Sequence, residues 1–459
     1  MNSSAPRAKI PSPGSITRRR LLAASAGAAL ALPLGRSAWA QAGVTDVDVA
    51  IVGGGAAGIA AARKIAESGR SYVLLEAGPK LGGRARTDTA FGQVFDLGAG
   101  SFGGGGGLTA AADAGKLPTA DLPSGRRLFI DGREARAGRY DAFTAALGRA
   151  RREILAAADG GKDPAASTTL TTPDDWSATV AALLGPLSCG RGLAELSSLD
   201  LSLRHVPPDD TTSPIGVGAM LEALGAWLST QTHAPVTAIS NSGRTHTLSL
   251  AGQRGQIRAR AVILAVPAAV IAAGAIRFNP SLPPRLVGAF RALPSGALEQ
   301  VAFQLPGNPL ALEPDESVLA KVSGNAVPAL LRGRVNGSDL HVLTFGGAPA
   351  REIGEKGEEA ALRLTRGFLN TAFGRSHGEA VTEVACSRWT TDPLIRGALA
   401  AALPGQGAQR RLFAEPVQNR ILLAGEYTVT NDWGTLNGAW ESGEVAAEKA
   451  LRLVGAGPA

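Results

Sequence analysis

The sequence contains little cysteine and little histidine. Only two of its 459 residues are cysteines, Cys189 and Cys386, so a disulfide framework is excluded. A single bridge between them is one alternative, but both lie in mostly apolar stretches without partners that would activate a nucleophilic thiol. We therefore expect two buried, inert thiols. The five histidines include no pair spaced three or four residues apart, and we expect no metal site.

Long apolar runs and an excess of charge are also missing from most of the chain. Hydrophobic residues make up 45% and charged residues 19%, as in globular proteins. Beyond position 40, no segment has 18 apolar residues without a break, so we expect no membrane-spanning helix there. Six of the 46 basic residues and none of the 39 acidic residues fall within 1–40, which leaves the remainder with a net charge of +1. Such a nearly neutral body excludes strong attraction to phosphate, and we expect no nucleic-acid partner.

The first 40 residues are ordered like an export signal. A polar stretch precedes TRRRLL at positions 17–22, an Ala-rich apolar run covers 21–34, and Ala-Trp-Ala at 38–40 is typical of a cleavage site. The apolar run is shorter than the roughly 20 residues that a membrane-spanning helix needs. The arginine pair resembles the twin-arginine signal, whose pathway exports folded proteins. We therefore predict that the twin-arginine export machinery recognises residues 1–40 and that the mature protein is periplasmic.

A strand, a glycine-rich turn and a helix follow this leader. The β-rich run DVAIV leads directly into GGGAAG at 53–58, and an Ala-rich helical segment covers 59–68. A second strand at 72–75 ends in Glu76, which lies 23 residues after the first glycine of the turn. This order of strand, turn, helix, strand and acid is the fingerprint of dinucleotide binding.

The positions of this fingerprint have separate physical roles. Gly53 makes the tight turn, Gly55 lets the backbone approach a pyrophosphate, and Gly58 lets the helix pack closely on the strand. The phosphates then lie at the helix N-terminus, and the acid binds ribose hydroxyls. The cofactor-binding residues predicted from this region are Gly53, Gly55, Ala57, Gly58 and Glu76.

The next motif distinguishes FAD from NAD, which share that fingerprint. The run LGGRART at 81–87 places Gly83 and Arg84 where a backbone amide and a guanidinium can reach the diphosphate. It resembles the second nucleotide motif of the flavoprotein superfamily that contains amine oxidases, protoporphyrinogen oxidase and carotenoid desaturases. DLGAGSF at 96–102 resembles that superfamily's strand and turn leading to the flavin ring. The resemblance implies FAD as the cofactor.

The C-terminal region resembles the flavin-containing amine oxidase family more specifically. ILLAGEYT at 421–428 is typical of a buried strand that ends in an acid, and LNGAWESGE at 436–444 begins a helix whose N-terminal amides would face the electron-rich edge of the flavin. In the family, the equivalent of the acid lies beside the ribityl chain, and a valine placed like Val236 contacts adenine through its backbone. The resemblance adds four cofactor-binding residues: Val236, Gly425, Glu426 and Leu436.

The resemblance extends over residues 44–102, 213–303 and 386–452. It implies an α/β fold of the amine oxidase and glutathione reductase-like superfamily, with a discontinuous Rossmann-type FAD-binding domain and an α+β substrate domain. The predicted FAD-binding segments are 44–107, 213–296 and 414–455, and the predicted substrate-domain segments are 108–212 and 297–413.

The segments between the motifs show local periodicity. Apolar residues recur at helical spacing over 140–158, and we expect another helix over 355–372 and a strand over 340–345. The five consecutive glycines at 103–107 match no motif, and we interpret them as a mobile loop.

Near the predicted flavin, the sequence both matches and departs from the family. Trp389 begins a tryptophan, Asp-Pro and glycine pattern that resembles the approach to the substrate cavity, and it would flank the flavin. The aromatic pair that often encloses the amine falls here on Leu399 and Thr435, and neither is aromatic. The lysine that commonly holds a water near the flavin is Gln300. The cage is absent unless another aromatic residue replaces it, and the candidates are Trp433, Tyr427 and Trp440.

The resemblance implies an exported FAD-dependent oxidoreductase that oxidises the C–N bond of a small amine or amino acid by hydride transfer to flavin N5. Oxygen or a periplasmic acceptor would take the electrons. Some members tether FAD through a cysteine at the position of Ala398, so we expect noncovalent FAD. Because Gln300 is neutral, we expect slow reoxidation by oxygen unless another cation replaces the lysine. Two alternatives stay open: a desaturase or dehydrogenase of the same fold acting on a C–C or other C–H bond, and a catalytically quiet flavin-binding subunit.

Overall fold

Two large β-sheets organise the part of the chain that the computed structural model describes, residues 44–204, 210–252, 255–324 and 326–455. The predicted export signal at 1–40 lies outside these residues. None of the helices within them is long and apolar enough to cross a membrane.

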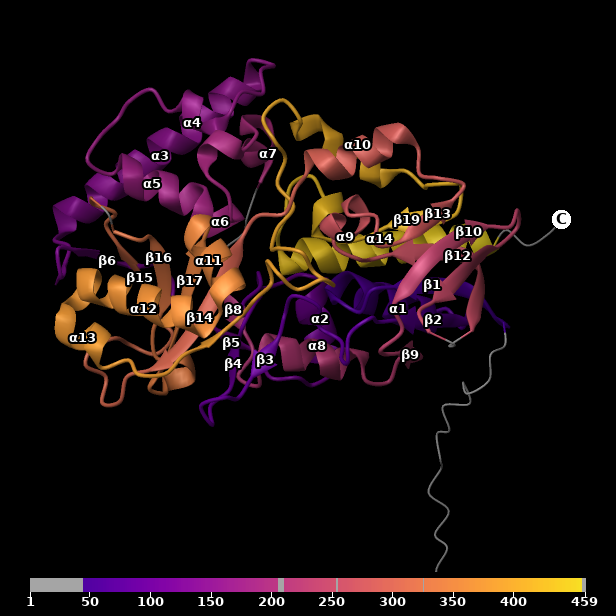
Figure 1. Ribbon diagram of the computed structural model, residues 1–459, viewed down its shortest axis with the longest axis horizontal. Helices are drawn as coiled ribbons and strands as arrows, with labels where there is room; N and C mark the ends of the chain where they lie inside the picture. The colour runs from indigo at the N-terminus through magenta and orange to yellow at the C-terminus, as the bar shows by residue number, and fades with distance from the viewer. Residues whose placement is uncertain (1–43, 205–209, 253–254, 325, 456–459) are drawn as a thin grey trace, which may run out of the picture. The chain divides into compact units, whose positions relative to one another are not determined.

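The first sheet contains the predicted nucleotide-binding strands. β1 (Val44–Val52) runs parallel to β2 (Tyr72–Leu75) on one side and to β12 (Gln256–Leu264) on the other. The strand order is β13-β10-β11-β12-β1-β2-β9, and β19 (Ile421–Leu423) also runs parallel to β12. Segments far apart in the sequence therefore meet with their carboxyl ends at one edge (Figure 1). The other strands are β9 (Thr230–Gln231), β10 (Val236–Asn241), β11 (His246–Leu250) and β13 (Arg277–Asn279).

Helices cover both faces of this sheet because β1 is apolar on both sides. Val49 and Ile51 enter one core, and the alternating Ala50 and Val52 enter another. Figure 1 shows α1 and α8 on one side of β1 and α10 on the other. The helices of the first core are α1 (Ala56–Glu67), α2 (Gly107–Ala114), α8 (Val217–Gly225) and α14 (Leu436–Gly455), and those of the second are α9 (Ala268–Ala272) and α10 (Pro284–Ala292).

The second sheet is mostly antiparallel, with the order β18-β14-β17-β16-β15-β6-β7. Its faces alternate in the same way: Phe129 packs in the core with α11 and α12, and Leu128 in the core with α3 and α5. The strands are β6 (Arg127–Ile130), β7 (Arg133–Glu134), β14 (Leu298–Gln304), β15 (Ser317–Ala320), β16 (Ala329–Arg332), β17 (Leu340–Gly346) and β18 (Ala385–Cys386). The helices are α3 (Ala137–Asp159), α5 (Ser177–Leu184), α11 (Ala348–Lys356) and α12 (Glu358–Phe373).

The remaining elements are shorter. The helices are α4 (Ala166–Thr169), α6 (Pro186–Cys189), α7 (Ser198–Leu203) and α13 (Arg375–Glu379), with 3-10 turns η1 (Leu193–Glu195), η2 (Val335–Gly337), η3 (Gly407–Ala414) and η4 (Glu426–Thr428). Two small ribbons are formed by β3 (Thr87–Asp88) with β4 (Phe95–Asp96), and by β5 (Ala120–Asp121) with β8 (Thr211–Thr212).

Two expectations for secondary structure were wrong in part. The helix expected over 355–372 is divided between α11 and α12, because Gly357 has a φ of +66° and interrupts the helical backbone. The glycine run 103–107 is not a loop throughout: Gly107 begins α2, and the amides of Gly103 and Gly104 donate hydrogen bonds to Asn437 and Asp210. The helix over 140–158 and the strand over 340–345 are confirmed by α3 and β17.

Candidate active site

A cavity of about 1000 Å³ extends from the carboxyl edge of the first sheet to the second sheet. At one end, Val52, Leu75 and Ala265 line it just where β1, β2 and β12 finish. At the other end, β14, β16 and β17 contribute the wall. The crevice beyond the carboxyl ends of parallel strands is where α/β proteins bind their ligands.

Glycines allow close backbone approach at the first end. Gly53 has a φ of +105°, and a Cβ there would lie 2.7 Å from the Ala265 carbonyl oxygen. A Cβ on Gly83 would lie 3.1 Å from Gly55 Cα, so these two turns touch. Gly53, Gly55 and Gly83 line the cavity, whereas Gly58 does not. A Cβ on Gly58 would lie 1.8 Å from the Gly53 carbonyl oxygen, so Gly58 acts through the packing of α1 on the glycine turn.

The N-terminus of α1 opens into the same end of the cavity. Gly55 is its N-cap and supplies no side-chain hydrogen bond to the first turn. Gly55, Ala56 and Ala57 all line the cavity, so the unpaired amides of this turn lie at its wall. Unpaired amides and the helix dipole together favour a bound anion.

Glu76, directly after β2, and Val236, in β10, also line this end. The Glu76 carboxylate accepts hydrogen bonds from the amides of Gly54 and Gly78, both at 2.6 Å. Each carboxylate oxygen keeps a further lone pair for a ligand hydroxyl. Val236 is the first residue of β10, where it pairs with Leu250 of β11.

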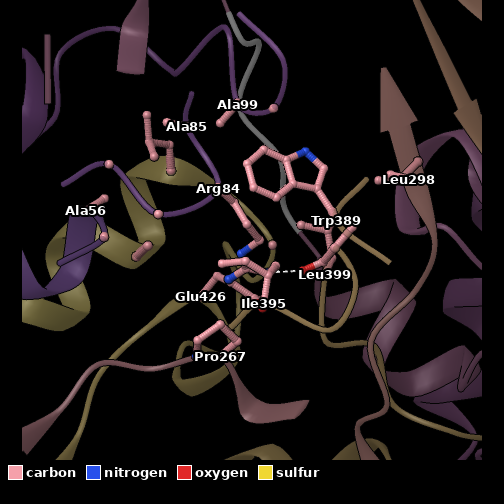
Figure 2. Close-up of a pocket in the computed structure, with 18 of the residues that line it drawn as sticks. Ala56, Arg84, Ala85, Ala99, Pro267, Leu298, Trp389, Ile395, Leu399 and Glu426 are labelled. Carbon is pink, nitrogen blue, oxygen red and sulfur yellow. Dashed lines mark hydrogen bonds and ion pairs between the residues drawn. The ribbon is translucent and has the colours of Figure 1, made fainter. Parts of the chain in front are cut away.

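Arg84 and Glu426 form an ion pair in the middle of the cavity. Arg84 Nη1 lies 3.3 Å from Glu426 Oε1 and also donates to the Ala398 carbonyl oxygen. The Ala400 amide donates to the same Glu426 oxygen at 3.1 Å. Figure 2 shows Arg84 between Glu426 and the loop that carries Trp389 and Leu399.

Several buried polar atoms in this wall lack partners within the described residues. They include Glu426 Oε2, Trp389 Nε1 and the Tyr427 hydroxyl. Burial raises the pKa of Tyr427 well above its usual range, so this hydroxyl stays protonated. A buried polar atom without a partner is costly, so a polar ligand is expected to complete this wall.

The C-terminal motif shapes the wall beside the ion pair. Gly425 has a φ of +134°, and its amide donates to Ser442 of α14 at 2.8 Å. Thr435 and Leu436 line the cavity at the N-terminus of α14, whose dipole is directed at the cavity with its positive end.

Glu299 positions Trp389, and the motifs did not reveal it. This fully buried carboxylate in β14 accepts from the amides of Trp389 and Thr390 at 2.9 and 2.8 Å, and from the hydroxyls of Ser387 and Thr390 at 2.6 Å each. Its only sequence signal is an acid in a strand that carries no other charge. The next residue, Gln300, lies on the alternate face, lines the cavity and accepts a hydrogen bond from the Gly98 amide.

The proposed replacements for the aromatic cage are wrong for two of the three residues. Leu399 and Thr435 do line the cavity, but Trp433 does not. Its fully buried ring lies between the guanidinium groups of Arg204 and Arg410, 4.9 and 4.6 Å from the ring centroid. Trp440 is likewise buried in the core of the first sheet. Among the described lining residues, only Trp389 and Tyr427 are aromatic.

A buried ion pair that the sequence analysis missed fixes the loops beneath the cavity. Arg410 Nη2 lies 2.7 Å from Asp200 Oδ2, and both side chains are almost fully buried. Arg410 also donates to the carbonyl oxygens of Ala400 and Tyr427, on either side of the Glu426 contact. Arg410 therefore links the segment around Ala400 to the segment around Tyr427, and both segments form the wall of the cavity.

Two family models match the sequence. The model of the flavin containing amine oxidoreductase family matches residues 128–451, and that of NAD(P)-binding Rossmann-like domains matches residues 51–114. The chain therefore belongs to the flavin-containing amine oxidoreductase family and is an FAD-dependent oxidoreductase. This confirms the family, the fold class and the kind of enzyme predicted from the sequence.

Individual relatives are more distant. Lysine-specific histone demethylase 1B of Mus musculus is 24% identical over 57% of this chain, and the match spans 33% of that relative, about a third of its length. Polyamine oxidase 5 of Oryza sativa subsp. japonica is 25% identical, with 88% of this chain and 87% of the relative covered. A solved structure of putrescine oxidase bound to putrescine superposes with a TM-score of 0.75 at 19% identity, covering 89% of this chain and all of that one. This last likeness shows a shared fold.

Proposed function

We propose that this enzyme binds FAD noncovalently and oxidises the C–N bond of a small amine or amino acid. The observation that carries the proposal is the continuous cavity wall from the glycine turn and α1 to the Trp389 loop. This wall joins an anion-binding end to a second end that Leu298, Trp389 and Leu399 help to line, as an extended nucleotide cofactor requires. The names of the polyamine and putrescine oxidases among the relatives support an amine as the substrate class.

The residues at the first end fit FAD by their chemistry. The amides at the start of α1, with Gly83 and Arg84, would hold the diphosphate, and Glu76 would accept ribose hydroxyls. The unpaired Glu426 Oε2 would accept a hydroxyl of the ribityl chain. Val236 would contact adenine and the amides at Leu436 the flavin pyrimidine edge. Neither cysteine lines the cavity within the described residues, and Ala398 does, which supports a noncovalent cofactor.

FAD, when bound, supplies the acceptor for a hydride from the substrate carbon. The residues of the chain orient the substrate and exclude water. Leu298 and Leu399 give an apolar surface at the second end, and Trp389, which is buried and held by Glu299, closes one side. In the view of Figure 2, Trp389 and Leu399 lie between Ala56 of the nucleotide end and Leu298 of the second sheet.

One observation favours a second function. Leu399 and Thr435 face the cavity without an aromatic ring, which suits a desaturase or dehydrogenase acting on a C–C or other C–H bond. Candidate substrates are added to the purified holoenzyme without oxygen, and the flavin absorbance distinguishes between these functions. Bleaching of the flavin by amines or amino acids supports the proposal, bleaching only by apolar unsaturated compounds supports the second function, and no bleaching by either set supports a quiet flavin-binding subunit.

We also propose that the protein is exported to the periplasm by the twin-arginine pathway. The TRRRLL sequence at 17–22 supports this. Replacing Arg18 and Arg19 together by Lys should leave an active, uncleaved precursor in the cytoplasm. Cell fractionation followed by immunoblotting checks this, and normal periplasmic recovery of the double variant would mean that another route carries the protein.

A further inference from the structure

The charges on the cavity wall are not balanced at the second end. Within the described residues, the basic side chains that line the cavity are Arg84, Arg126, Arg204 and Arg332, and the acidic ones are Glu76, Asp96, Asp210, Asp315 and Glu426. Two arginines are neutralised: Arg84 by Glu426, and Arg332 by Asp315 at 2.8 Å. Neither Arg126 nor Arg204 has a carboxylate within ion-pair distance in the described part of the chain.

None of the remaining described acids that line the cavity lies within ion-pair distance of Arg126 or Arg204, and each accepts hydrogen bonds from other groups. The Glu76 carboxylate accepts hydrogen bonds from two backbone amides at the nucleotide end. The Asp96 carboxylate accepts hydrogen bonds from the Thr87 hydroxyl at 2.6 Å and from the amides of Val217 and Gly218. Burial raises the pKa of Asp96. Asp210 is exposed and accepts the Gly104 amide. The second end therefore presents uncompensated positive charge rather than a carboxylate for a cation.

Arg204 lies beside the residues that replace the aromatic cage. A methyl group on Gly434, between Trp433 and Thr435, would lie 3.6 Å from Arg204 Nη2 and 3.1 Å from Leu399 Cδ1. The guanidinium is held by neutral groups: Nη1 donates to the Ser188 hydroxyl, and Nε donates to the Trp433 carbonyl oxygen at 3.2 Å. These bonds fix the position of the Arg204 guanidinium, and because the partners are neutral, its charge stays available to a ligand.

Arg126 reaches the cavity from the second sheet. It directly precedes β6, which pairs with β15, and Ser317 at the start of β15 lines the same wall. Its buried Nε has no hydrogen-bond partner among the described residues. Burial, and then the charge of Arg151, lower the pKa of Arg126, so an anion at this position would relieve an unfavourable charge.

We propose that the substrate of this enzyme carries a carboxylate, which Arg204 and Arg126 bind while the carbon beside the nitrogen faces the flavin. The inference rests on the proposed function and narrows its substrate to amino acids. A guanidinium pairs with a carboxylate through two parallel hydrogen bonds, which fixes orientation as well as affinity. A diamine would instead bring its second ammonium group toward two unpaired guanidinium groups.

The first test measures binding without turnover. Benzoate and hexanoate are titrated into the oxidised holoenzyme, with benzamide as the neutral comparison, and binding is followed by flavin absorbance and by equilibrium dialysis. We expect the carboxylates to bind and to lose at least tenfold in affinity in Arg204→Gln or Arg126→Gln, with benzamide unaffected. Arg133→Gln is the matched control, because Arg133 is exposed in β7 and does not line the cavity. Absence of carboxylate binding, or equal affinity in all variants, would overturn the inference.

The second test separates this inference from the proposed function. Anaerobic flavin reduction is compared within pairs that differ by one carboxylate: ornithine and putrescine, phenylalanine and phenethylamine. Faster reduction by the amino acid, lost in Arg204→Gln and partly rescued in Arg204→Lys, supports the inference. Equal or faster reduction by the amine overturns it and leaves amine oxidation standing. If no compound reduces the flavin, the proposed function fails, and the binding titration alone decides whether the anion site exists. Because Arg204 also packs on Trp433, Arg126→Gln keeps the test valid should Arg204→Gln fail to fold.

Discussion

The two ends of the cavity differ in whether backbone or side chains line them. The nucleotide end consists largely of backbone: glycine turns, the first amides of α1 and the end of β1, mostly from residues close together in the sequence. The substrate end consists of side chains that arrive from distant elements, such as Arg204 after α7, Gln300 in β14 and Thr435 before α14. Substitutions of the glycines at the first end therefore act through shape, whereas substitutions at the second end act through charge and positioning.

The largest effect is expected for Gly58→Ala at the nucleotide end. The added Cβ would lie 1.8 Å from the Gly53 carbonyl oxygen, so α1 must move away from the glycine turn. We expect loss of bound FAD and a decrease of about 3 kcal/mol in the free energy of unfolding. The flavin-to-protein absorbance ratio and urea unfolding measure the two effects. Gly367→Ala in α12 is the control, because a Cβ there meets nothing within 4 Å; retention of flavin in Gly58→Ala would contradict the role of shape.

Glu299→Gln should have the next largest effect, at the substrate end. The amide nitrogen of Gln cannot accept, so two of the four donors around the carboxylate lose their partner, at roughly 3 kcal/mol. Urea unfolding measures the loss, and near-ultraviolet circular dichroism reports displacement of Trp389. Flavin content should be unchanged. The exposed Glu383→Gln serves as control. Wild-type stability together with an unaltered spectrum would show that Glu299 does not hold the Trp389 loop.

Glu76→Ala should weaken the nucleotide end without touching the substrate end. Loss of a charge-assisted bond to the ribose is expected to lower FAD binding by roughly 2 kcal/mol, or about 30-fold in Kd. Fluorescence titration of the apoprotein with FAD measures this Kd. The rate of flavin reduction by substrate at saturating FAD should stay near that of the wild type. If FAD binding is undiminished, Glu76 serves only the amides of Gly54 and Gly78.

Gln300→Lys should have the smallest effect, on the electron acceptor alone. A positive charge near the flavin favours transfer of an electron to oxygen, and Gln300 supplies none. We expect slow reoxidation of the reduced enzyme by oxygen and an acceleration of roughly tenfold in the variant. Stopped-flow mixing with air-saturated buffer measures both rates. Fast reoxidation of the natural enzyme without further acceleration would show that Arg126 or Arg204 already supplies the charge.

Much of the nucleotide end could be predicted from the sequence. The strand, glycine turn and helix around Gly53 form a contiguous unit whose backbone geometry depends on neighbouring residues. They appear as β1 and α1, and Gly53 makes the turn between them with a positive φ. The family and the cofactor follow from this unit and from the motif around Glu426, because glycines and acids at these spacings have few other uses.

At the substrate end, Gln300, Trp389, Leu399 and Thr435 were predicted from the sequence and do line the cavity, but other features could not be predicted. Trp433 was a candidate for the aromatic cage, but its indole is buried between Arg204 and Arg410, and its carbonyl oxygen accepts from Arg204, a residue 229 positions away. Glu299 carries only the weak signal of a lone charge within a strand, and the unpaired Arg126 carries none, because the burial and charge balance of a side chain depend on what the fold packs around it. Short motifs thus specify the fold and the cofactor through local backbone geometry, whereas packing between distant segments decides which further side chains face the substrate.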